Sequence, residues 1–132
     1  MTSLTPARDA ALAMREKMRG AIAPEIAAGG TRKMHAELTL GFNEVIALHI
    51  ADCSDQNVDA RDCFRALEGA MANAVGTIVM SGSEGQEDRP RVWSGFLLNV
   101  AEKSRRALKL VEAGVEGTSI STNIDQTPVG NS

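Results

Sequence analysis

The sequence predicts an all-α protein, a single domain built as an antiparallel bundle of about four helices. Composition is the first reason. Of the 132 residues, 43% are hydrophobic but only 3% are aromatic, so a core must consist mainly of Leu, Ile, Val, Met and Ala, which favours helices over strands. Periodicity is the second reason. Apolar residues recur every three or four positions in four segments, and the short connections between these segments favour antiparallel neighbours.

The first helix is predicted over residues 6–19. Thr5 is a suitable N-cap, and Pro6 suits the first helical position. Gly20 and Pro24 are expected to interrupt the helix. Its stripe is thin and rich in alanine and methionine: Leu4, Ala7, Ala11, Met14, Met18 and Ile22. A thin stripe predicts weak or adaptable docking, so a three-helix core with a loosely attached first helix is the alternative to a four-helix bundle.

The second helix is predicted over residues 32–52, with Thr31 as its N-cap. Gly41 interrupts it at a cost of about 1 kcal/mol relative to alanine, and indicates either a close helix crossing or a kink. One face carries large apolar side chains and a histidine, with Ile46 and Cys53 on its flank: Met34, Leu38, Phe42, Val45 and His49. We expect this face to contact the core.

A third helix is predicted over residues 60–80. Asp59 precedes it and Asp62 lies in its first turn, where acidic side chains act as caps and suit the helix dipole. Its apolar stripe consists of Phe64, Leu67, Met71, Val75 and Ile78, beside a line of small residues, Ala66, Ala70 and Ala74. Such a wide face predicts contact with more than one neighbour, so we expect this helix to be the central one.

The fourth helix is predicted over residues 90–113, after a loop at 81–88. Asp88 is its expected N-cap, and Gly114 suits the C′ position beyond its end. Its stripe is the most regular of the four and includes Ser104 among Trp93, Phe96, Leu97, Val100, Ala107, Leu108 and Val111. We expect this stripe to face the core as well.

Residues 1–114 are therefore predicted to form the helical domain. Residues 115–132 are polar, contain proline and glycine, and are expected to form a disordered tail. No apolar run reaches the roughly 18 residues of a membrane span, and residues 1–28 lack the apolar core of a signal peptide. Two cysteines without a secretory signal predict reduced thiols in the cytoplasm.

Charge is distributed in blocks along the chain. Residues 1–36 carry more bases than acids, residues 37–88 are strongly acidic, and residues 89–112 are basic again. Such blocks indicate helices of opposite charge that lie side by side. They are also typical of a dipolar surface that docks on a partner.

The segment from His49 to Cys63 is the candidate chemical site, because it holds both cysteines and one of the two histidines. His49 and Cys53 are four residues apart and share a helix side, and an antiparallel hairpin would return Cys63 to them. An oxygen ligand could come from a nearby carboxylate: Asp52, Asp59 or Asp62. The group is a candidate zinc site, although its spacing matches no standard zinc signature. The alternatives are small apolar cysteines beside a core histidine, or a redox pair of Cys53 and Cys63.

His35 suggests a second chemistry. Histidine phosphotransfer domains are also helical and of similar size, and in them an exposed histidine accepts a phosphoryl group beside a cation. Here Glu37 follows His35 and no lysine lies one turn later, so the local charge opposes phosphate. The other interpretation is an ordinary surface histidine.

A basic line on the fourth helix is the candidate protein-binding surface: Arg91, Leu98, Arg105 and Lys109. At about 100° per residue these side chains lie within roughly 40° of one another, away from the apolar stripe. They suit an acidic protein surface or phosphates. Nucleic acid is the weaker candidate, because the chain is net acidic, has few aromatics for stacking and contains no reader motif. The alternative is a solvated face with an exposed leucine.

Motifs for catalysis are missing from the sequence: there is no P-loop, no HExxH and no Glu-x-x-His pair. We therefore expect a small cytoplasmic interaction or regulatory protein rather than an enzyme, acting as a monomer or a homodimer. Its expected contact elements are the first helix and the basic line. The alternatives are a metal-binding or thiol-redox module at His49, Cys53 and Cys63, and a phosphotransfer domain at His35. We expect no cofactor, with zinc at His49, Cys53 and Cys63 as the alternative.

Overall fold

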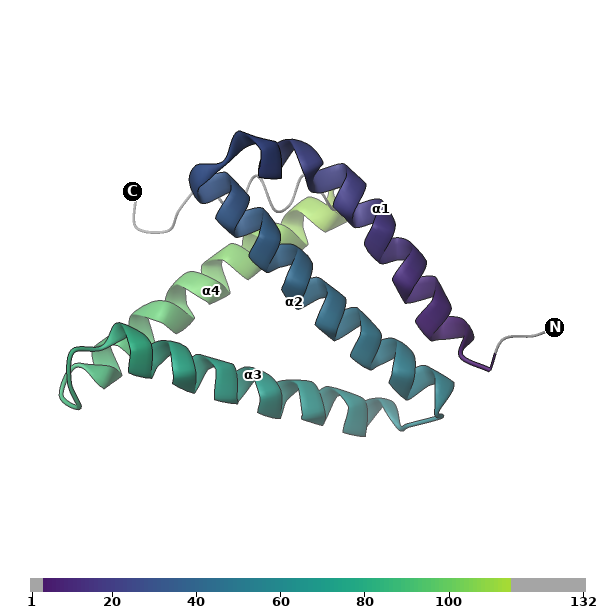
Figure 1. The fold of residues 1–132 in the computed structure, drawn as a ribbon. Coiled ribbons are helices and arrows are strands. Elements are labelled where there is room, and N and C mark those ends of the chain that lie inside the picture. Colours follow the sequence, from purple (N-terminus) through teal and green to yellow (C-terminus); the bar gives the residue numbers. More distant parts are fainter. Residues whose placement is uncertain (1–3, 115–132) are drawn as a thin grey trace.

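A computed structural model describes residues 4–114, and these form four α-helices (Figure 1). In chain order they are α1 (Pro6–Ala28), α2 (Gly30–Asp55), α3 (Ala60–Gly82) and α4 (Arg89–Glu112). The all-α prediction is confirmed. The predicted tail at 115–132 lies outside the described residues. No helix among residues 4–114 is both long and apolar enough to cross a membrane.

The first two helices form an antiparallel hairpin (Figure 1). Gly29 and Gly30 form its turn with φ angles of 71° and 59°, in the left-handed region that glycine adopts without a steric penalty. The predicted end of the first helix was wrong, because α1 continues through Gly20 and Pro24 to Ala28. Ile22 lies in this extension and is only 6% exposed. Its burial at the closed end of the hairpin supports a helical turn that local preference disfavours.

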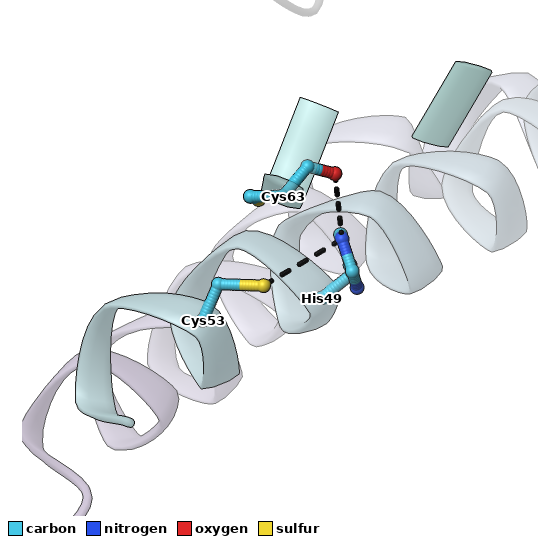
Figure 2. A group of neighbouring side chains, drawn as sticks. All are labelled: His49, Cys53 and Cys63. Carbon is cyan, nitrogen blue, oxygen red and sulfur yellow. Dashed lines mark hydrogen bonds between the residues drawn. The ribbon is translucent and has the colours of Figure 1, made fainter. Parts of the chain in front are cut away.

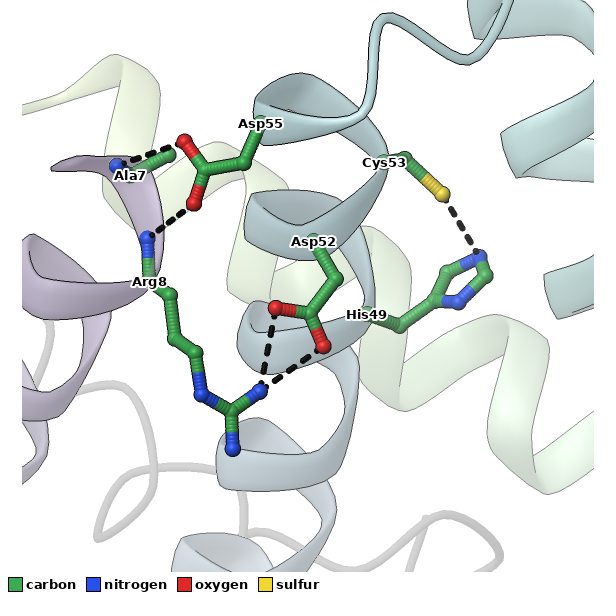
Figure 3. Close-up of polar contacts among 6 residues, drawn as sticks. All are labelled: Ala7, Arg8, His49, Asp52, Cys53 and Asp55. Atoms are coloured by element: carbon green, nitrogen blue, oxygen red, sulfur yellow. Dashed lines mark hydrogen bonds and ion pairs between the residues drawn. The ribbon is translucent and has the colours of Figure 1, made fainter. Parts of the chain in front are cut away.

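Opposite charges join α1 to α2, as the charge blocks predicted. Arg8 pairs with Asp52 at 2.8 Å, and Arg15 pairs with Glu44 at 2.9 Å. The first turn of α1 is capped from α2, because both carboxylate oxygens of Asp55 accept backbone N–H bonds at 2.9 Å, from Ala7 and from Arg8 (Figure 3). Thr5 occupies the predicted N-cap position of α1, but its side chain makes no capping bond.

The face of α2 that contacts α1 is not the predicted one. Small and medium side chains line this contact on α2, among them Leu40, Ala47 and Leu48, opposite Ala11 and Met18 of α1. Ala36 and Ala51, on the same side of α2, are buried. The predicted face lies roughly on the opposite side of the helix at 100° per residue. Helix α2 therefore has two apolar faces, and α1 covers only one of them.

Helices α2, α3 and α4 form an open triangle (Figure 1). Helix α3 contacts α2 and α4, while α1 contacts α2 alone among the described helices. The hairpin of α1 and α2 is the most extensive contact, so the alternative with a loosely attached first helix was wrong. Helix α3 meets α4 where Val79 is buried, beside Pro90 and Trp93. Helix α3 therefore connects α2 to α4. It is not the central helix, packed against several neighbours, that its wide apolar face predicted.

The helix ends test the remaining capping predictions. Thr31 was wrong as the N-cap of α2, because the helix begins at Gly30 and Gly29 occupies that position. Asp59 caps α3, because its carboxylate accepts the Arg61 N–H at 2.7 Å. Gly114 adopts a φ of 80° after α4, as expected of a C′ glycine. Asp88 occupies the predicted N-cap position of α4, but its side chain makes no capping bond. Its carboxylate instead accepts bonds from the Glu84 N–H and from Arg91.

Candidate functional site

The first candidate site is the uncovered apolar face of α4. This helix is the most amphipathic of the four, yet it contains no buried residue. Leu108 on its apolar stripe is 63% exposed, and Trp93 is 50% exposed. An amphipathic helix normally buries its apolar stripe. The stripe of α4 is therefore a surface that is suited to a further helix.

Side chains along α4 also have the spacing of a helix–helix seam. Apolar or small residues alternate at intervals of four and three: Trp93, Leu97, Val100, Ser104, Ala107 and Val111. This repeat averages 3.5 residues and is the pattern of a coiled-coil contact. A polar residue inside such a seam favours one register over others. This signal was present in the sequence and was interpreted there only as a core stripe.

The predicted core stripes of α2 and α3 are largely exposed too. On α2 these exposed residues are Met34, Leu38, Phe42 and Val45; on α3 they are Phe64, Met71 and Ile78; on α4 they are Trp93, Val100, Leu108 and Val111. The expectation that these side chains form the core of one chain was wrong. Helices α2, α3 and α4 instead each carry an apolar face that no described residue covers.

The basic line lies on α4 away from this stripe, as predicted. Leu98 is 63% exposed within it. Two of its cations are already paired within one turn, Arg91 with Asp88 and Arg105 with Glu102. The hydrogen bond from Arg91 lowers the pKa of Asp88, and the hydrogen bond from Arg105 lowers the pKa of Glu102. The line is therefore less strongly basic than its sequence indicates.

The second candidate site is the predicted cluster at the corner between α2 and α3 (Figure 2). His49, Cys53 and Cys63 each offer one ligand atom, and these atoms all lie within 4.8 Å of one another. The Cys53 Sγ is 3.6 Å from His49 Nε2, and His49 Nε2 is 3.1 Å from the carbonyl oxygen of Cys63. The structure thus brings together all three residues that the sequence had proposed as metal ligands.

The chain reversal between α2 and α3 positions this cluster. His49 and Cys53 lie one turn apart in the last turns of α2, and Cys63 lies in the first turn of α3. The connection is short: the Val58 N–H bonds to the Cys53 carbonyl at 2.8 Å, and Asn57 adopts a φ of 56°. Asparagine tolerates this left-handed conformation better than most residues. The tight reversal returns Cys63 to the side of α2 that carries the other two ligands.

Among the thiols of the cluster, Cys53 has a raised pKa. Cys63 is buried and Cys53 is half-buried, and both are free. Burial raises the pKa of the Cys53 thiol above its ordinary value, and the hydrogen bond with Cys63 raises it further. A buried thiol resists ionisation because a low-dielectric surrounding disfavours the thiolate. A thiol whose pKa is raised is a poor nucleophile, so Cys53 is not arranged as an activated cysteine.

The carboxylates that were predicted as oxygen ligands lie elsewhere. Asp52 points toward α1 and pairs with Arg8, whereas the next residue, Cys53, points toward His49 (Figure 3). Asp59 caps α3. No acidic residue among residues 4–114 joins the three-residue group. The prediction of a fourth ligand from Asp52, Asp59 or Asp62 was therefore wrong.

His35 is separate from this cluster. It lies 14 positions before His49 on α2, about 21 Å along the helix at 1.5 Å per residue. It is half-buried, and the nearby Lys33 pairs with Glu37 at 3.9 Å. The cation closest in sequence thus already has an acidic partner.

Comparison of the chain with protein-family models, curated proteins and solved structures finds no match. Fold and sites together define an open, all-helical chain with uncovered apolar faces and a His–Cys–Cys cluster. Functional conclusions therefore rest on the geometry of these two features.

Proposed function

We propose that this protein is a small cytoplasmic interaction protein that acts as a homodimer, in which the apolar faces of α2, α3 and α4 contact a second copy of the chain. One observation carries the proposal: the most amphipathic helix, α4, contains no buried residue. The two free thiols suit the reducing cytoplasm in which we place the protein.

The amount of exposed apolar surface supports this proposal. On the predicted apolar stripes, four side chains of α2, three of α3 and four of α4, eleven in all, are large, apolar and 39–69% exposed. Full burial of one such side chain contributes about 1.5–3 kcal/mol, so covering eleven half-exposed ones is worth on the order of 10 kcal/mol before entropic costs. This is comparable with the whole net stability of an ordinary domain, about 5–15 kcal/mol.

A second copy is the occupant that fits this area. At about 25 cal/mol per Å², a burial energy of about 1.5–3 kcal/mol corresponds to roughly 60–120 Å² of apolar surface for each fully exposed side chain. Eleven half-exposed side chains therefore offer about 500 Å² of apolar surface. Homodimer interfaces are about 65% apolar. If the roughly 500 Å² of apolar surface is about 65% of the contact, the whole contact buries roughly 800 Å² on each partner, which is the size of a standard stable interface. In a two-fold symmetric contact the same apolar faces serve both sides.

The seam spacing of α4 supports the same occupant. Two copies of α4 can pack along it, with Val100 and the flanking Leu108 in the contact. The basic line would then remain on the outside of the dimer. We assign its exposed Leu98 and Lys109 to docking on the acidic surface of another protein, which would give the dimer an adaptor or regulatory role.

Light scattering coupled to size-exclusion chromatography tests the proposal. At concentrations up to about 100 µM the reduced protein should elute at twice its 14.0 kDa mass. Leu108→Asp should shift the mass to that of a monomer, because a carboxylate in the seam must be desolvated. Leu98→Asp is the matched control, since both leucines lie on α4 and both are 63% exposed.

The control should remain dimeric. A monomeric wild-type protein throughout this range would refute the homodimer. Dissociation by Leu98→Asp but not by Leu108→Asp would also refute it, because the basic line and not the seam would then form the contact. Circular dichroism should confirm that both variants keep the wild-type helix content.

A further inference from the structure

We propose that His49, Cys53 and Cys63 bind one Zn²⁺ ion, which fixes the corner between α2 and α3. The inference rests on the placement of three ligand atoms from two helices within 4.8 Å of one another. It does not rest on the proposed homodimer: His49 lies at the end of the apolar face of α2, but it and Cys53 are half-buried and Cys63 is buried, so the ligands come from one chain.

Distances in the cluster match zinc coordination. Zinc binds cysteine sulfur at about 2.3 Å and histidine nitrogen at about 2.0–2.1 Å in a tetrahedron, which places the two ligand atoms about 3.6 Å apart. The separation of Cys53 Sγ from His49 Nε2 is 3.6 Å. The remaining separations, within 4.8 Å, need adjustments of about 1 Å, which side-chain rotation can supply.

The donor set selects the metal. Two thiolates and one imidazole favour Zn²⁺ over the oxygen-seeking ions Mg²⁺ and Ca²⁺. On binding, the two thiols release their protons to the buffer and form two Zn–S bonds. His49 Nε2 exchanges its contact with the Cys63 carbonyl, 3.1 Å away, for a Zn–N bond. Water fills the fourth position, since no acidic residue among residues 4–114 joins the group.

The position of the cluster gives the ion a structural consequence. The contact between α3 and α2 is much smaller than the contact between α1 and α2. Cys63 is the buried residue at the N-terminal end of α3. Two of the ligands are on α2 and the third is on α3, so a single ion links the two helices across their short connection. In the same turns of α2, Asp52 and Asp55 bind α1 (Figure 3). Zinc would therefore join α3 to the most firmly held part of the hairpin.

Metal titration of the reduced, metal-free protein tests this inference. Zinc binding is measured by competition with a chromophoric chelator and by native mass spectrometry. Co²⁺ serves as the spectroscopic probe, since thiolate ligation in a tetrahedral site gives characteristic charge-transfer and d–d absorption. One ion per chain is expected. Amide hydrogen exchange in the first turn of α3 should slow when zinc is added, because the link restrains local opening.

Variants of the ligands provide the specificity test. Cys63→Ser and His49→Gln should each weaken zinc binding by roughly 100-fold and abolish or shift the cobalt spectrum. The matched control is His35→Gln, which removes the other histidine of α2 and should bind zinc like the wild type. Leu108→Asp should also keep one zinc per chain, so that failure of the homodimer and failure of the zinc site are distinguishable.

Three results would overturn the zinc site. The first is the absence of zinc uptake by the reduced wild-type protein. The second is uptake that survives both Cys63→Ser and His49→Gln. The third is an equal loss of affinity in His35→Gln. Circular dichroism of each metal-free variant against the metal-free wild type shows whether the helices are intact, so a lost ion is attributed to the ligand and not to unfolding.

Discussion

Replacing Asp55 by alanine is the most direct test of how α1 is held. In the wild type both Asp55 oxygens accept backbone N–H bonds at 2.9 Å from Ala7 and Arg8, so a residue 47 or 48 positions away in sequence performs the capping role. A lost cap costs about 0.5–2 kcal/mol, and a carboxylate beside a helix N-terminus adds about 0.3–1 kcal/mol. Because Asp55 is only half-buried, solvent screening reduces the charge contribution.

We therefore expect Asp55→Ala to lower the free energy of unfolding by about 1–2 kcal/mol. Urea denaturation followed by circular dichroism at one fixed protein concentration measures this change, since self-association would otherwise shift the midpoint. Thr5→Ala is the comparison, because Thr5 occupies the N-cap position but its side chain makes no capping bond. The reasoning fails if Thr5→Ala destabilises the protein as much as Asp55→Ala does, or if Asp55→Ala costs less than about 0.3 kcal/mol.

Two further predictions concern substitutions of single residues. Arg91→Ala should raise the pKa of Asp88 towards its ordinary value, because Arg91 donates the main hydrogen bond that lowers it, and an NMR pH titration of the carboxyl carbon measures the change. Because the pKa of Asp88 is lowered in the folded protein, the Arg91–Asp88 contact stabilises the fold at pH values above the unfolded-state pKa of Asp88. This stabilisation disappears as the pH falls through the folded-state pKa. An unchanged pKa of Asp88 in the variant would contradict the prediction. Gly41→Ala should stabilise α2 by about 0.5–1 kcal/mol in thermal unfolding, since no atom lies within 4 Å of an added Cβ and Gly41 is helical. Destabilisation would instead indicate a close helix crossing at Gly41.

Helix positions were largely predictable, because they depend on local signals. Asp59 before α3 and Gly114 after α4 act as the sequence indicated. The end of α1 was not predictable in this way. Gly20 and Pro24 are unfavourable inside a helix by local preference, and only the burial of Ile22 in the hairpin compensates for them.

The faces of α2 show a second limit of sequence interpretation. Periodicity identified Met34, Leu38 and Phe42 as one face, and they do share one. It could not reveal that α1 would pack on the smaller residues of the other face, including Ala36 and Ala51. Small side chains let two helix axes approach closely, and the ion pairs of Arg8 and Arg15 flank this contact.

The three ligands of the candidate metal site were predictable from the sequence, but a fourth ligand was not. The spacing of His49 and Cys53 is a local property of any helix, and the short connection returned Cys63 to them as expected. The fourth ligand was not predictable from the sequence. Asp52 lies just before Cys53 in the chain, but α1 engages it through Arg8, 44 residues away.

By itself, the sequence determined the all-helical class, the four segments and the residues that share each helix face, because these properties follow from backbone geometry and neighbouring residues. Tertiary structure alone decided which face of α2 meets α1, that Asp55 caps α1, and that the stripe of α4 stays uncovered. The physical reason is that burial depends on which surfaces compete for the same partner. Among residues 4–114, α1 covers one side of α2 only, and the apolar faces of α2, α3 and α4 stay largely exposed.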